Sequence, residues 1–249
     1  MKVMNIDELY DLEFRKLIKS KRLTIIIPVG SIEQHGAHLP ISTDSDIVTE
    51  IASRLAKKCG FIVFPTISYG VSFEHYPLFN TSIDEEILSR MIIQICDSLI
   101  QSVIPKIIIL NGHHGNIQAL KIFEEELSSG KLAYSTRKLS KKISNSNIIR
   151  FFNYWEFMKH EFDHAGFVET SLMLAISNKV KMKKAKKGLI TKGLSEKEKK
   201  RISKLSAKVG GFPQVTKNGV WGDPTGATKK DGQKLIVEIV RNLAKKCQS

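Results

Sequence analysis

Three short apolar runs, each followed by a helical pattern, most constrain how this chain can fold. The runs are residues 23–29 (LTIIIPV), 61–65 (FIVFP) and 107–110 (IIIL). Each is followed, directly or after a loop, by apolar residues at helical spacing, over about 45–58, 84–101 and 117–128. Strands that alternate with helices need crossover connections, which build a mostly parallel sheet between helical layers. The sequence therefore predicts a three-layer α/β/α fold.

The remaining segments extend this pattern at both ends. Residues 6–20 predict an amphipathic first helix, and residues 231–246 predict an amphipathic last helix. Two weaker strand candidates lie at 132–134 and 148–152. The sequence contains no internal repeat and no linker-like stretch. We therefore expect one domain over residues 1–249.

The composition is that of a soluble globular protein, with 42% hydrophobic and 26% charged residues among 249. No apolar run approaches the roughly 18 residues that a membrane-spanning helix needs, so no membrane association is expected. The N-terminus lacks the layout of a secretory signal, which predicts a cytoplasmic protein. The three cysteines, Cys59, Cys96 and Cys247, are far apart and predict reduced thiols.

The loop after the first apolar run carries an unusual number of potential metal ligands. Residues 30–46 (GSIEQHGAHLPISTDSD) contain three carboxylates and two imidazoles. Glu33 and His35 are two residues apart, so on an extended segment their side chains point to the same side. Asp44 can return to the same point from the start of the next helix, where Thr43 or Asp44 is expected as the cap.

A second loop, residues 111–116 (NGHHGN), follows the third apolar run and carries His113. Ligand sites of parallel sheets lie outside the carboxyl ends of the strands, so both loops can converge there. Carboxylates with imidazoles suit Zn²⁺, Mn²⁺ or Fe²⁺, and the lack of nearby thiolates disfavours a structural zinc site. Asp44 could bridge two ions, as carboxylates do in two-metal hydrolases.

Each of these residues also has an ordinary explanation when taken alone. Glu33 or Asp44 could cap a helix or lie in solvent, and His35 could be a hydrogen-bonded loop residue. A metal site is favoured because four such residues occur at the ends of two strands. A third segment contains His164 before a predicted helix and Glu169 in its first turns. Glu169 is either an exposed helix residue or, if buried, a group that needs a cation or a partner.

Four motifs, in order along the chain, resemble the creatininase (creatinine amidohydrolase) family. They are residues 28–36 (PVGSIEQHG) through Asp44, residues 111–116, residues 164–166 (HAG) with 169–171 (ETS), and residues 219–224 (GVWGDP) with 227–228. The resemblance implies an α/β fold, a dinuclear metal centre and a homo-oligomer, often a hexamer. It also implies a hydrolase acting on carbon–nitrogen bonds other than peptide bonds.

The resemblance assigns roles to individual residues. Glu33, Asp44 and His113 would hold one metal, and His35 and Asp44 the other. True creatininases have a second-metal Glu at the position of Gly115, and our hypothesis is that Glu169 takes its place. His164 resembles the proton-shuttling residue, and Glu169 is counted with it as catalytic.

The loop at residues 69–75 resembles the family's substrate loop, with Phe79-Asn80-Thr81 in place of Phe-Pro-Gly-Thr. We expect Ser72, His114 and Trp155 to bind substrate, although Trp155 could equally be a core residue. These departures from the family pattern point to an amide or formamide other than creatinine itself.

The net charge of +14 is concentrated between Lys179 and Lys204. A solvated insertion is the favoured interpretation; the alternative is a segment that attracts anionic substrates or nucleic acid. No recognition module accompanies it, so a nucleic-acid partner is not expected. A phosphorylated small-molecule substrate is a third possibility.

The sequence therefore predicts a metal-dependent amidohydrolase with two divalent ions (Zn, Mn or Fe) per subunit. Its substrate would be a small molecule with a C–N amide bond, such as a creatinine-like cyclic amide or a formamide. The alternatives within the family are a formamidopyrimidine-type deformylase and a peptide-maturation hydrolase. The alternative from another class is a non-enzymatic anion or nucleic-acid binder.

Overall fold

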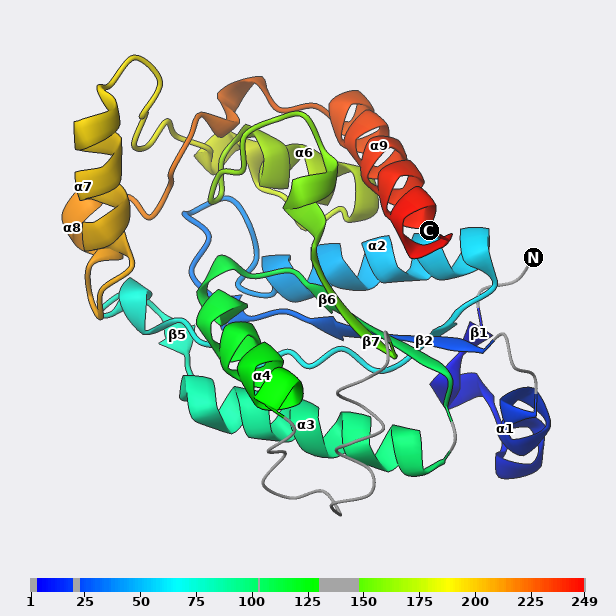
Figure 1. Ribbon diagram of the computed structural model, residues 1–249. Coiled ribbons are helices and arrows are strands. Elements are labelled where there is room, and N and C mark those ends of the chain that lie inside the picture. The colour runs from blue at the N-terminus through cyan, green and yellow to red at the C-terminus, as the bar shows by residue number, and fades with distance from the viewer. Residues whose placement is uncertain (1–3, 20–22, 103, 130–147, 249) are drawn as a thin grey trace.

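The computed structural model describes residues 4–19, 23–102, 104–129 and 148–248. Its central sheet has five strands in the order β1-β4-β2-β6-β7, and every pairing is parallel (Figure 1). The strands are β1 (Met4–Asn5), β2 (Thr24–Val29), β4 (Ile62–Val63), β6 (Lys106–Asn111) and β7 (Ile149–Asn153). A separate antiparallel pair joins β3 (Ile32–Glu33) to β5 (Asn80–Thr81). The predicted parallel sheet is confirmed.

Helices cover both faces of the sheet, as the alternating strand side chains require. Ile26 and Ile108 pack in one core, with α2 (Thr43–Cys59), α6 (Phe167–Ile176) and α9 (Lys229–Gln248). Ile25 and Ile107 pack on the opposite face, with α3 (Glu85–Gln101) and α4 (Ile117–Ser129). Figure 1 shows these two helical layers above and below the strands. The fold is therefore the predicted three-layer α/β/α arrangement.

Several element boundaries differ from the sequence prediction. The expected single helix at 6–20 is wrong, because a 3₁₀ helix η1 (Ile6–Glu8) precedes α1 (Asp11–Ile18). Tyr10 between them is extended, and the Glu13 carboxylate accepts its backbone N–H at 3.2 Å, which starts a new helix there. Ser42 is the N-cap of α2, so Asp44 lies inside the first turn. The strand candidate at 148–152 is confirmed as β7, and the candidate at 132–134 lies outside the described residues.

The register of the sheet places the two ligand-bearing loops side by side. Val29 at the end of β2 pairs with Asn111 at the end of β6, and the Gly112 N–H donates to the Val29 carbonyl at 2.8 Å. Two short 3₁₀ helices, η2 (Phe73–His75) and η4 (Tyr154–Phe157), belong to the loops around this edge. The helices α7 (Glu196–Ser206) and α8 (Phe212–Val215) stand apart from the layers, and α8 contacts η2 (Figure 1). None of the helices described is long and apolar enough to cross a membrane.

Candidate metal centre

Asp44 lies between two imidazoles at the carboxyl end of the sheet. Its Oδ1 is 3.1 Å from Nε2 of His35, and its Oδ2 is 2.9 Å from Nδ1 of His113. Oε2 of Glu33 lies 3.2 Å from Nε2 of His113, and Oε2 of Glu169 lies 3.5 Å from Nε2 of His35. All five residues are buried. The structure therefore brings together every residue that the sequence suggested as a metal ligand.

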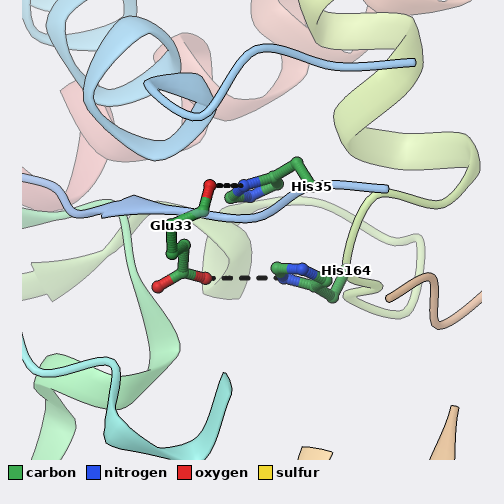
Figure 2. Close-up of side chains that lie close together, drawn as sticks. All are labelled: Glu33, His35 and His164. Atoms are coloured by element: carbon green, nitrogen blue, oxygen red, sulfur yellow. Dashed lines mark hydrogen bonds and ion pairs between the residues drawn. The ribbon is translucent and has the colours of Figure 1, made fainter. Parts of the chain in front are cut away.

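The hydrogen bonds of the two imidazoles determine which of their nitrogens carry protons. Nδ1 of His35 lies 3.2 Å from the Glu33 carbonyl oxygen (Figure 2), and Nε2 of His113 lies 2.8 Å from the Val71 carbonyl oxygen. A carbonyl only accepts, so these nitrogens are the donors. In a neutral ring, the other nitrogen presents a lone pair to the Asp44 carboxylate, which is repulsive unless a metal ion or a second proton lies between them. Metal-binding histidines are usually held in this way.

Several buried carboxylate oxygens accept no hydrogen bond of good geometry, although imidazole nitrogens lie close to some of them. They are both oxygens of Glu33, Oδ2 of Asp44 and Oε1 of Glu169. Buried polar atoms are rarely left in this state, so they are consistent with a cation that satisfies them. Within the described residues, potential ligand atoms gather as Glu33–Asp44–His113 and as His35–Asp44–Glu169, with a third group, Glu33–His35–His164. The first two groups share Asp44, so the donor set fits two ions with Asp44 between them.

The pKa shifts in the cluster also favour a bound cation. Burial alone would raise the pKa of Glu33, but the neighbouring imidazoles of His113 and His75 outweigh it and lower this pKa to about 2. Burial opposes a charged His35, yet the Asp44 and Glu169 carboxylates raise the pKa of this imidazole to about 10. Burial also raises the pKa of Glu169 well above its ordinary value. The excess of carboxylates thus draws protons onto the site, and a divalent ion would supply the same positive charge.

His164 lies beside this cluster and faces the cavity. Its Nδ1 is 3.7 Å from Oε1 of Glu33 (Figure 2), and its ring lies between those of His35 and His75, with centroid distances of 4.3 and 4.8 Å. Burial and the neighbouring charge of His35 lower the pKa of His164 well below its ordinary value. The ring is therefore neutral and free to accept a proton.

Two residues that the sequence analysis did not assign also belong to the site. Nε2 of His75 lies 2.9 Å from Oε1 of Glu33, and the Gln34 carboxamide nitrogen lies 3.0 Å from Nδ1 of His75. His75 lies in residues 69–75, which resemble the family's substrate loop, so the sequence did indicate that this loop reaches the site. A third, Glu74, lines the cavity 3.7 Å from Nε2 of His113.

Gly115 has no room for a side chain. A Cβ there would lie 2.1 Å from the Val71 carbonyl oxygen and 2.4 Å from Nε2 of His113. The carboxylate that true creatininases are expected to carry at this position cannot be accommodated by this backbone. Glu169 approaches the cluster from α6 instead. Its Oε2 accepts the Ala165 N–H at 2.6 Å, and its Oε1 has no hydrogen-bond partner.

A cavity of about 600 Å³ opens above the cluster. His114 and Trp155 both line it, and their rings are 6.1 Å apart, with Phe162 stacked 4.7 Å from Trp155. Ser72 is not among the lining residues. It is fully buried and bonded to protein groups, through its hydroxyl to Ser31 and through its N–H to the Ser82 hydroxyl. Of the three residues expected at the substrate, the structure places two at the cavity.

The fold and this cluster define an α/β/α protein with a carboxylate–imidazole site at the carboxyl end of a parallel sheet. The sequence model of the Creatininase family, described as creatinine amidohydrolase, matches residues 7–247. The chain belongs to the creatininase family. It is therefore an amidohydrolase by family, an enzyme that cleaves carbon–nitrogen bonds.

Individual relatives and structures agree with this assignment. A mycofactocin precursor peptide peptidase of Mycobacterium ulcerans is 30% identical over 87% of this chain and 81% of its own. A creatinine amidohydrolase of Pseudomonas putida is 27% identical over 66% of this chain and 68% of its own. A solved structure described as creatininase Mn has a TM-score of 0.77 at 21% identity, covering 98% of this chain and 97% of that one. The last comparison establishes the fold alone.

Proposed function

We propose that this protein is a metal-dependent amidohydrolase that uses two divalent ions per subunit. The observation that carries the proposal is the position of Asp44, with one oxygen against each of two imidazoles whose other nitrogens donate to backbone carbonyls. Glu33, Asp44 and His113 would hold one ion, and His35, Asp44 and Glu169 the other. Zn²⁺, Mn²⁺ and Fe²⁺ all suit this set of oxygen and nitrogen donors.

When bound, such ions polarise the substrate carbonyl and make water a nucleophile near neutral pH. The protein's own contribution to the proton transfers would come from His164. Its Nδ1 faces Glu33 and the cavity, and its pKa is lowered, so it can accept the proton of the attacking water. It would then return that proton to the nitrogen that leaves as the C–N bond breaks.

The substrate class proposed first is a small molecule with an amide or formamide bond, held between the aromatic wall and the cluster. Trp155 and His114 offer flat surfaces at the cavity, which suit a planar amide or ring. Because Ser72 is buried and hydrogen-bonded to Ser31 and Ser82, we do not assign it a direct substrate contact.

A second candidate is the end of a peptide. The Mycobacterium ulcerans relative supports it by its name, and the size of the cavity is a further argument. About 600 Å³ falls within the roughly 300–1,000 Å³ that accommodates drug-sized ligands, which is more than one five-membered ring requires. Cleavage of a terminal amide would use the same site and the same proton transfers.

The test is hydrolysis by the purified protein with added Zn²⁺, Mn²⁺ or Fe²⁺, using creatinine, a formamidopyrimidine, a cyclic urea and short peptides. Products are identified by mass spectrometry, and bound metal is measured on the same samples. Turnover that requires metal supports the proposal. A protein that binds no divalent ion, or that binds ions without hydrolysing any of the four classes, contradicts it.

We also propose that the protein forms a homo-oligomer. Large apolar side chains are exposed: Tyr76 by 66% and Phe79 by 54%, three residues apart, and Val209, three residues after α7, by 73%. Burial of such groups against a second copy is favourable. Light scattering after size-exclusion chromatography measures the subunit count, and a monomer would contradict this proposal.

A further inference from the structure

Gln34 lies between the two histidines that flank Glu33, and it contacts both of them. Its carboxamide nitrogen is 3.0 Å from Nδ1 of His75 and 3.0 Å from Nε2 of His164. Its backbone carbonyl oxygen is also 3.0 Å from Nε2 of His164. The two imidazole rings lie against each other at a tilt of 32°, with centroids 4.8 Å apart.

The orientation of the Gln34 carboxamide follows from its other contact. Its Oε1 lies 3.0 Å from the backbone nitrogen of Gly36, which can only donate. The oxygen must therefore point to Gly36, and the NH₂ group must point to the imidazoles. Gly219 packs tightly on this oxygen: a Cβ there would be 1.9 Å from it, and φ at Gly219 is +70°. A side chain at position 219 would therefore displace the carboxamide from this orientation.

This orientation assigns the proton on His75. Nδ1 of His75 faces an N–H donor, so it must be the unprotonated nitrogen of the ring. The proton is then on Nε2, which lies 2.9 Å from Oε1 of Glu33. A proton on Nδ1 would place two donors against each other. Gln34 therefore keeps Nδ1 of His75 unprotonated, with Nε2 turned towards the Glu33 carboxylate.

Gln34 can serve His164 in either protonation pattern. The backbone carbonyl accepts a proton carried on Nε2, which leaves Nδ1 as the lone pair that faces Glu33. The carboxamide N–H is placed to donate to the same Nε2 when the proton is on Nδ1 instead. Neither pattern requires the ring to move.

We infer that Gln34 is a positioning residue: it fixes the tautomer of His75 and holds His164 with Nδ1 aimed at the Glu33 side of the cavity. The part that concerns His164 in catalysis rests on the proposed function. The part that concerns the tautomer of His75 does not.

The test compares Gln34→Glu with wild type and with Gln94→Glu, a control that makes the same chemical change at an exposed position of α3. The Zn²⁺-loaded proteins are labelled with ¹⁵N-histidine, and the ring nitrogen shifts report which nitrogen carries the proton. Wild type and Gln94→Glu should show His75 protonated on Nε2. In Gln34→Glu the new carboxylate accepts instead of donating, so Nδ1 should become protonated.

The kinetic measurement uses whichever substrate of the four-class screen the wild type hydrolyses. Loss of a residue that orients such a group costs roughly 10–100-fold in activity, and we expect this loss in kcat, with KM and bound zinc unchanged. If His75 in wild type is protonated on Nδ1, or if Gln34→Glu changes neither the tautomer nor kcat, the inference is overturned. If wild type hydrolyses nothing, the proposed function fails while the ring shifts still test Gln34.

Discussion

The floor and the outer wall of the cavity are built in opposite ways. The floor consists of carboxylates and imidazoles that are almost wholly buried and come from β3 and the residues after it, from the loop after β6, from α2 and from α6. The wall includes α7, of which Ser206 is the only buried residue, with Ser203 and Ser206 turned to the cavity. The ion pairs of α7 lie in solvent: Lys199 and Glu196, 2.8 Å apart, have side chains 41% and 78% exposed.

This contrast suggests that the floor carries out the reaction and the wall selects the substrate. The floor is held by strand register and by hydrogen bonds to backbone carbonyls, so its chemistry depends on the fold as a whole. In the wall, α7 buries only Ser206, and exposed ion pairs such as its own contribute little to stability. We therefore expect substitutions in the floor to abolish the reaction, and substitutions in the wall to change which substrate is preferred.

The largest effect should follow Asp44→Asn, which removes the charge that both ligand groups share. Bound metal should fall to a trace, and the loss of activity should exceed the roughly 10–100-fold cost of altering an outer-shell partner. Asp46→Asn is the matched control on the same helix, since Asp46 pairs with exposed Lys179 at 3.5 Å. Metal analysis by mass spectrometry checks this. Full metal content in Asp44→Asn would show that Asp44 is not required for metal binding, which contradicts the expected difference between floor and wall.

The next effect should come from His164→Gln, which separates proton transfer from metal binding. A positioned acid–base group contributes typically 100- to 10,000-fold, so kcat should fall by about that factor. Bound metal should stay at the wild-type level. His160→Gln is the control, because His160 is exposed and stacks at 5.9 Å on Phe167. A variant that keeps its kcat would remove His164 from the mechanism.

Glu169→Gln should act in opposite directions on the metal-free and the metal-loaded protein. The buried carboxylate lacks a partner at Oε1, and its raised pKa means that the ionised form destabilises the fold. The neutral amide should therefore stabilise the metal-free protein by about 1 kcal/mol or more. It should also reduce the increase in Tm produced by Zn²⁺, because metal affinity is lower.

Calorimetry with and without Zn²⁺ checks both halves of the Glu169 prediction. Glu124→Gln, at an exposed position of α4, is the control and should leave both values unchanged. An equal Zn²⁺-induced increase in Tm for Glu169→Gln and wild type would show that Glu169 is no ligand.

The sequence predicted most of the floor for reasons that the structure makes clear. The apolar runs identified β2 and β6, and their parallel pairing brings the loops that follow these two strands, which carry residues 33, 35 and 113, to one edge. Glu169 was suggested by the cost of burying an unpaired carboxylate. These inferences need only strand order and polarity.

The contacts of Gln34 and His75 could not be predicted in the same way. They join residues 41 positions apart, and they depend on which way a carboxamide is turned by the Gly36 N–H. Ser72 shows the converse, since a loop position can face the cavity or, as here, the protein interior. The break in the first helix at Tyr10 depends on a local cap that helical periodicity does not reveal.

The smallest effect should follow Lys200→Glu in the wall. Lys200 is exposed and lies one turn before Ser203 on α7, so its charge is close to the cavity mouth. The free energy of unfolding should change by no more than about 0.5 kcal/mol. For an anionic substrate, KM should rise by roughly two- to fivefold at low salt, because the reversal of one exposed charge near the substrate costs up to about 1 kcal/mol in water.

Salt separates this effect of Lys200→Glu from a change in shape, since exposed charges are screened within about 8 Å at physiological ionic strength. The rise in KM should therefore vanish at high salt and be absent for a neutral substrate. Lys16→Glu, on α1, makes the same change away from α7 and should leave KM unaltered. If Lys200→Glu leaves KM for anionic substrates unchanged at low salt, the basic segment is a solvated surface only, and substrate preference must reside in the aromatic side chains of the cavity.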